Sequence, residues 1–202
     1  MRVEIVKELD PGDDTLEIPW ASPTQPDWRY IDLKTHPEEI ARLQECRNYP
    51  ALADFLRKLN SASCPFRTAK CDVWATTDLA EDERLDFKLP FKVGSYVDLL
   101  FDHPHLNSQL EPHLQLGERL GKPLGDLRLQ AQMEICLRRC LFHSEERWGY
   151  YLTIFVHAYS ATPQEAEEEW NLALDALGEA LVGTGQLLCR VPANPANRGP
   201  SP

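Results

Sequence analysis

Three histidines come nearest, by type and spacing, to a site that could carry out chemistry. His103 and His105 stand in the run Asp-His-Pro-His, and His113 follows eight residues after His105. Neutral imidazoles are good zinc ligands, and three of them with a bound water would make an open catalytic site. The more specific helical motif His-Glu-x-x-His is absent from the sequence. A histidine-based metal hydrolase is therefore the weakest of three functional hypotheses, and surface histidines are the simpler interpretation.

Other catalytic patterns have less support. The run from Gly117 to Gly121 lacks the Lys and Ser/Thr of a phosphate-binding loop, and no Gly-x-Ser-x-Gly nucleophile elbow occurs. Asp98, Asp102 and Glu134 could converge from neighbouring strands as paired carboxylates for acid–base work. They fall on the polar face of those strands, where solvated charges are expected. We therefore expect no catalytic residue and no cofactor, and a non-enzymatic protein is favoured.

An acidic segment is the clearest candidate for a binding surface. Residues 162–182 hold six carboxylates and neither Lys nor Arg. Negative charge stabilises the first turns of a helix, but that explanation does not extend to the later Asp175 and Glu179. Leu172 falls among the acids on a helical wheel, and such a face suits a basic, partly apolar partner. The partner-binding residues predicted here are Glu165, Glu168, Glu169, Leu172, Asp175 and Glu179. A solvated acidic face is the simpler alternative.

Three arginines form a basic group in this acidic chain. Arg138, Arg139 and Arg147 flank a predicted strand hairpin near Trp148. Their charge is complementary to the acidic segment, so head-to-tail self-association is one hypothesis for them. An anion site is another, and a hairpin tip that uses charge against aggregation is the simplest.

Alternating side chains predict the strands that would position these residues. The odd positions from 127 to 137 are all apolar and most even ones are polar, which is typical of a strand with one buried face. The links between successive strands are short, so antiparallel pairing is expected. The main strands predicted are 66–78, 87–102, 126–142 and 150–159. Residues 1–20 predict a further hairpin, which with the loop to residue 34 forms an N-terminal appendage.

Helical signals precede and follow these strands. Thr35 and Pro50 begin two short helices that reach about Arg47 and Asn60. The capping sequence 162–165 begins a long helix with one apolar stripe, and Gly183 is the expected C-cap.

The order of elements predicts an α+β fold. An antiparallel sheet of four or more long strands is expected to pack against the long C-terminal amphipathic helix, with two short helices before the main strands. Residues 1–191 are expected to form a single domain. The Pro-, Asn- and Ala-rich residues 192–202 are expected to form a disordered tail.

Two architectures fit this order, a ferredoxin-like sandwich and a helix-grip cup. The cup resembles the START-type lipid-binding fold in its element order. That resemblance implies a cavity between sheet and helix for a small hydrophobic ligand, used by a carrier or a cup enzyme. The cavity residues expected are Tyr96, Trp148, Tyr151 and Phe155.

Composition limits the partners. The net charge is -11, which disfavours nucleic acid because phosphates attract basic surfaces. No apolar run approaches the ~20 residues of a membrane span. The charged N-terminus does not resemble a signal peptide, so a cytoplasmic location with reduced cysteines is expected. The leading hypothesis is a non-enzymatic protein-binding or self-assembling domain with an acidic helix face.

Overall fold

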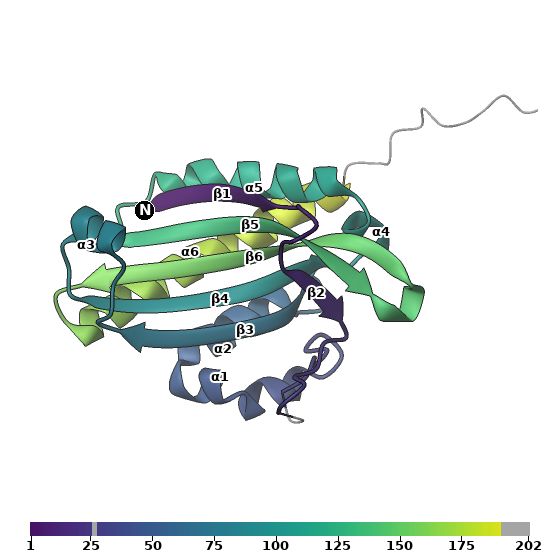
Figure 1. The fold of residues 1–202 in the computed structure, drawn as a ribbon, viewed down its shortest axis with the longest axis horizontal. Coiled ribbons are helices and arrows are strands. Elements are labelled where there is room, and N and C mark those ends of the chain that lie inside the picture. Colours follow the sequence, from purple (N-terminus) through teal and green to yellow (C-terminus); the bar gives the residue numbers. More distant parts are fainter. Residues whose placement is uncertain (26–27, 191–202) are drawn as a thin grey trace, which may run out of the picture.

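Six strands form one mixed sheet, and the expected α+β class is confirmed. The computed structural model describes residues 1–25 and 28–190, so the predicted tail 192–202 lies outside the described residues. The strand order is β1-β5-β6-β4-β3, and β2 also pairs with β5 (Figure 1). The strands are β1 (Arg2–Glu8), β2 (Thr15–Ile18), β3 (Phe66–Thr76), β4 (Phe91–Phe101), β5 (Ala131–Phe142) and β6 (Arg147–Ser160).

The expectation of a purely antiparallel sheet is wrong at one edge. Strands β3, β4, β6 and β5 pair antiparallel, as expected. Strands β1 and β2 instead both run parallel to β5, so the hairpin predicted over residues 1–20 does not form. Strands β1 and β2 place their apolar side chains on opposite faces of the sheet. Ile5 of β1 pairs with Ile135 on the helix side, whereas Leu16 and Ile18 of β2 pack with Cys140 on the opposite side.

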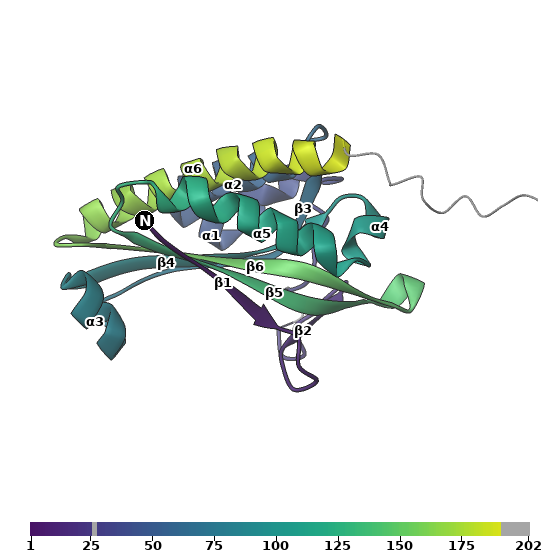
Figure 2. The same cartoon turned by 90° about the horizontal axis from the view of Figure 1, so that it is seen from above.

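Three of the helices cover one face of the sheet. Figure 2 shows α2, α5 and α6 on that face, and α3 with the loop after β2 on the other. The helices are a 3-10 helix (Pro37–Arg42), α1 (Gln44–Asn48), α2 (Pro50–Leu59), α3 (Glu81–Phe87), α4 (Pro104–Asn107), α5 (Leu110–Gly125), a 3-10 turn (His143–Glu145) and α6 (Pro163–Arg190). The first helix predicted from Thr35 is thus split in two, and α3 lies where only a short link was expected between the strands 66–78 and 87–102.

The main core lies between the sheet and these helices. Alternate residues of β5 and β6, such as Ile135 and Ile154, are buried there in one cluster with Leu177 of α6. Burial of each such side chain stabilises the fold by about 1.5–3 kcal/mol. The indole N–H of Trp170 donates to the Ser95 hydroxyl at 2.9 Å, which fixes α6 against β4.

Helix α6 extends beyond its expected end. Gly183 is not a C-cap, because the helix continues to Arg190. By length and composition alone α6 qualifies as a membrane span, yet its apolar stripe packs on the sheet and on neighbouring helices. Glycine permits close packing at two points on α6. Gly178 lies against Phe55 and Lys58 of α2, and Gly185 lies against Phe66.

Two glycines of α6 give a matched test of this packing. A Cβ at Gly185 would collide with the ring of Phe66, whereas a Cβ at Gly183 meets open space. We expect Gly185→Val to lower the free energy of unfolding by about 1–3 kcal/mol through overpacking. Gly183→Ala should raise it by up to about 1 kcal/mol, because alanine is the better helix former. Urea unfolding measures both, and equal effects would contradict this packing of α6.

Candidate functional site

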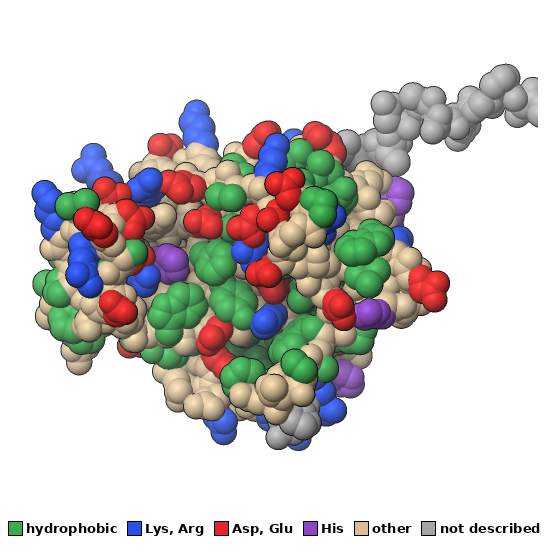
Figure 3. Space-filling view, viewed as in Figure 1, with side chains coloured by type: hydrophobic (Ala, Val, Ile, Leu, Met, Phe, Trp, Pro, Cys, Tyr) green, Lys and Arg blue, Asp and Glu red, His purple; other side chains and the backbone are tan. Residues whose placement is uncertain are grey.

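The face of the sheet opposite α2, α5 and α6 is only partly covered. Helix α3 lies over one end of it, and β2 with the following loop lies over the other (Figures 1 and 2). Figure 3 shows hydrophobic side chains gathered in the middle of this face, with acidic and basic side chains around them. We refer to this surface as the uncovered face.

Successive side chains of a strand point to opposite faces of the sheet, so every second residue of each strand reaches the uncovered face. Residues that pair directly across strands place their side chains next to one another. One row across the sheet is Lys70, Asp98, Thr153 and Cys136. The next row is Asp72, Tyr96, Phe155 and Glu134. The third row is Trp74, Gly94, His157 and Gln132.

Four half-buried rings form what we name the aromatic patch: Trp74, Tyr96, Phe155 and His157. The ring centroids of Tyr96 and Phe155 are 5.8 Å apart, and those of Phe155 and His157 are 6.2 Å apart. Trp74 meets His157 edge-on at 5.8 Å. Gly94 lies beneath this last pair, and a Cβ there would stand within 2.9 Å of both rings. Glycine on β4 therefore allows the two rings to close over the strand.

Two cations lie against the patch. The Lys70 ammonium is 6.0 Å from the centre of the Tyr96 ring. The Arg138 guanidinium is 5.7 Å from the centre of the Phe155 ring. Such placements stabilise by about 0.5–2 kcal/mol each. Arg138 is also held by the carboxylate of Glu8, at 2.6 Å, so it is less free than Lys70 to meet a partner.

A buried carboxyl lies among these side chains. The Thr153 hydroxyl donates to Asp98 at 2.6 Å. Burial raises the pKa of Asp98 to about 6, although the Thr153 hydrogen bond, Lys70 and Arg138 each oppose the shift. Burial likewise lowers the pKa of His157 to about 4, so this imidazole is neutral at pH 7. A carboxyl that titrates near neutral pH is a functional-site indicator.

The three carboxylates considered for acid–base work do not converge. Asp98 and Glu134 share the uncovered face but stand in different rows, with β6 between their strands. Asp102 lies at the end of β4 and is paired with Arg67 at 2.6 Å and with Lys34 at 3.3 Å.

The two ends of the uncovered face are closed by packing. At one end, Phe87 of α3 stacks on Tyr159 at 3.8 Å, and the Tyr159 hydroxyl donates to Glu83 at 2.7 Å. At the other end, Leu16 and Ile18 belong to a second small core. Its remaining members are Ala69, Leu100, Cys140 and Tyr151, with Trp20, Tyr30 and Phe142 packed against them. The aromatic patch is the part that stays accessible between these ends.

The acidic residues predicted on α6 are partly engaged within the chain. Asp175 and Glu179 both accept hydrogen bonds from the Lys58 ammonium of α2, at 2.9 and 2.7 Å. Glu169 accepts one from the backbone N–H of Gln130 at 3.1 Å. Of the other three residues, Glu165 and Glu168 are exposed. Leu172, with 58% of its surface exposed, is one of the large apolar side chains most open to solvent.

The three arginines do not form one cluster. Arg138 lies on the uncovered face with Glu8, as described. Arg139 donates to the backbone carbonyl of Asp10 at 2.6 Å and lies 5.9 Å from the Trp148 ring. Arg147 pairs with Glu145 at 2.8 Å. Adjacent positions on a strand point to opposite faces, so Arg138 and Arg139 are directed apart.

The three histidines are not brought together either. His113 is buried against Phe101, with ring centroids 5.0 Å apart, and burial lowers its pKa to about 4. His103 and His105 are exposed at the start of α4. Among residues 1–25 and 28–190, no group of three or more His, Cys, Asp or Glu side chains could hold a metal ion.

The four predicted cavity residues do not line one cavity between sheet and helix. Tyr96 and Phe155 are neighbours in the aromatic patch, but they face away from α6. Tyr151 belongs to the small core with Leu16. Trp148 is 58% exposed in the β5–β6 hairpin. The helix side of the sheet is filled instead by the buried apolar side chains of the main core.

Asp98 gives the site a testable pH dependence. An unfolded aspartate has a pKa of about 4, and burial raises that of folded Asp98 to about 6. As the pH rises, Asp98 therefore loses its proton at a lower pH in the unfolded state than in the folded state. Its contribution to the free energy of unfolding is present below about pH 4 and is lost as the pH rises to about 6. Asp98→Asn removes that loss. Relative to the wild type, the variant should gain about 2 kcal/mol in unfolding free energy between about pH 4 and about pH 7.

Urea unfolding at both pH values measures this difference. Asp72→Asn, which removes a carboxylate at an exposed position on the same face, is the control measured alongside it. The same wild-type-to-Asn difference at both pH values would show that the pKa of Asp98 is not raised.

Comparison of the chain with protein-family models, with curated proteins and with solved structures finds no match. The uncovered face is the feature of the molecule that points to a function. Exposure to solvent does not account for the aromatic patch on this face.

Proposed function

We propose that this chain is a non-enzymatic protein-binding domain whose binding surface is the aromatic patch with its charged rim. One observation carries the proposal. A sheet face open to water is ordinarily lined by polar side chains, yet this one presents Trp74, Tyr96 and Phe155. Aromatic residues and arginine are the types enriched at protein interfaces, because large rigid rings bury much area at low entropic cost.

The rim of the patch favours a basic partner. The carboxylates of Asp72 and Glu134 flank Tyr96 and Phe155 in the same row. Within the described residues they accept hydrogen bonds only from the Val73 backbone N–H and the Cys136 thiol. Such carboxylates, on a chain of net charge -11, attract and orient a partner that carries Lys or Arg beside apolar groups.

A foreign partner is favoured over self-assembly. Two copies that each carry a net charge of -11 repel one another at low salt. The charged residues that would join the acidic helix of one copy to the arginines of another are also partly paired within the chain. Lys58 already engages Asp175 and Glu179, and Glu8 engages Arg138. The acidic side of α6 still exposes Glu168 and Leu172. Because Asp175 and Glu179 on that side are already engaged by Lys58, it is the weaker candidate surface.

Site-specific photocrosslinking tests this surface. Lys70 is exposed beside the patch, and Glu118 is exposed on α5, one of the helices that cover the other face. With p-benzoylphenylalanine in place of Lys70, irradiation of the native cells should give a discrete crosslinked product with another protein. The same substitution at Glu118 should not give that product.

The pattern of products decides among the alternatives. Products that are the same at both positions, or absent at Lys70, would contradict a binding surface at the aromatic patch. A crosslink at Lys70 to a second copy of this chain would replace the foreign partner with self-association.

A further inference from the structure

We infer that the free edge of β3 receives an extended segment of the partner as an additional strand, with one apolar side chain of that segment seated in a notch beside α6. This inference rests on the proposed function and specifies how the partner is held. Strand addition gains affinity from backbone hydrogen bonds and specificity from pockets for alternate side chains.

Strand β3 is the last strand in the sheet order, and among residues 1–25 and 28–190 it pairs with β4 on one side alone. The first part of its edge is occupied by side chains. The Trp20 indole N–H donates to the carbonyl of Ala69 at 2.8 Å, and the Lys34 ammonium donates to that of Phe66 at 2.8 Å. A register shift between Thr68 and Lys70 further interrupts this part. Bulges and covering side chains are the usual protection of a sheet edge against pairing.

Within the described residues, no side chain from another element donates or accepts a hydrogen bond at the backbone of the second part of the edge, residues 70–76. Its one hydrogen bond to a side chain is local, because the backbone N–H of Val73 donates to the carboxylate of its neighbour Asp72 at 2.7 Å. A free stretch of seven residues matches the length of an ordinary strand, about 5–6 residues.

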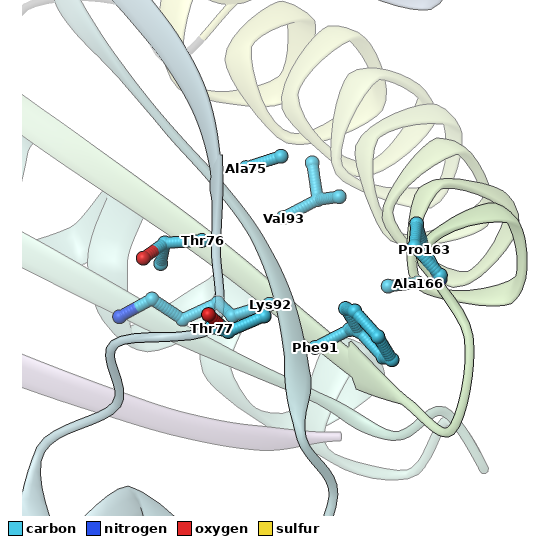
Figure 4. Close-up of a pocket in the computed structure, with 8 residues that line it drawn as sticks. All are labelled: Ala75, Thr76, Thr77, Phe91, Lys92, Val93, Pro163 and Ala166. Carbon is cyan, nitrogen blue, oxygen red and sulfur yellow. The ribbon is translucent and has the colours of Figure 1, made fainter.

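An apolar notch lies directly beside this free stretch. Ala75 of β3, Phe91 and Val93 of β4, and Pro163 and Ala166 of α6 surround it. Figure 4 shows these five side chains around one open space, while the ends of Thr76 and Lys92 point away to the other side of the sheet. The notch therefore opens on the helix side of the sheet, next to the edge.

The alternation of a strand determines the chemistry of the segment. One set of its side chains would lie beside Asp72 and Trp74 on the uncovered face, where a Lys or Arg suits the carboxylate. The other set would lie beside Val73 and Ala75 on the helix side, where the notch takes an apolar group. The fitting segment therefore alternates basic and apolar residues, which agrees with the basic partner proposed above.

A labelled peptide tests this inference on the full chain. The probe is acetyl-Lys-Val-Lys-Leu-Lys-Val-Lys-amide, followed by fluorescence anisotropy. We expect saturable binding that weakens at least about tenfold, about 1.4 kcal/mol, when alternate peptide nitrogens are methylated, because methylation removes the strand hydrogen bonds. Replacement of each Lys by Glu in the peptide should weaken binding by a similar factor.

Matched protein variants locate the bound peptide. Ala75→Gln fills the notch with a polar side chain and should weaken binding about tenfold, whereas Ala62→Gln, exposed before the other end of β3, should leave it unchanged.

Three results would overturn the inference: no saturable binding up to about 1 mM peptide, equal binding of the methylated peptide, or a dimeric light-scattering mass that falls to the monomer mass when the peptide is added. A position-specific crosslink from Lys70 to another protein, together with either of the first two results, would retain the proposed function and reject strand addition.

Discussion

One-sided cover of the sheet is the constraint on which this structure depends. Side chains of a strand alternate between faces, so the burial of Ile135, Ile154 and Val97 under the helices fixes what the other face must carry. A shift of one residue in any strand would exchange the two sets. The main core therefore determines that Tyr96, Phe155 and His157 stand in adjoining rows on the uncovered face. Packing on one side of the sheet thus builds the candidate site on the other.

The sequence was sufficient for the elements whose signals are local. Alternation predicted β4 and β5, and the capping sequence 162–165 predicted the start of α6. Two kinds of element were missed. The acidic link before Phe87 is too short for a periodic pattern to reveal α3. The parallel pairing of β1 and β2 with β5 joins residues more than a hundred positions apart, which no local pattern encodes.

The candidate site could be anticipated only in part. Tyr96 and Phe155 were named from their strands, although for a cavity on the helix side. Trp74 and His157 were missed, because their contact arises from strand pairing and from the small Gly94 between them. The acidic helix face was misjudged for a similar reason. Its partner Lys58 lies 117 residues from Asp175 and is brought near by the packing of α2 on α6.

Hydroxyl-radical footprinting tests most directly whether the uncovered face holds the partner. The chain would be labelled alone and in the complex purified from its native cells, and modification compared residue by residue. The expected result is that labelling of Trp74 and Phe155 falls in the complex, while the exposed Trp28 and Trp148 are labelled as before. Protection of Trp148 or Leu172 with unchanged labelling of Trp74 and Phe155 would contradict the account and place the partner elsewhere.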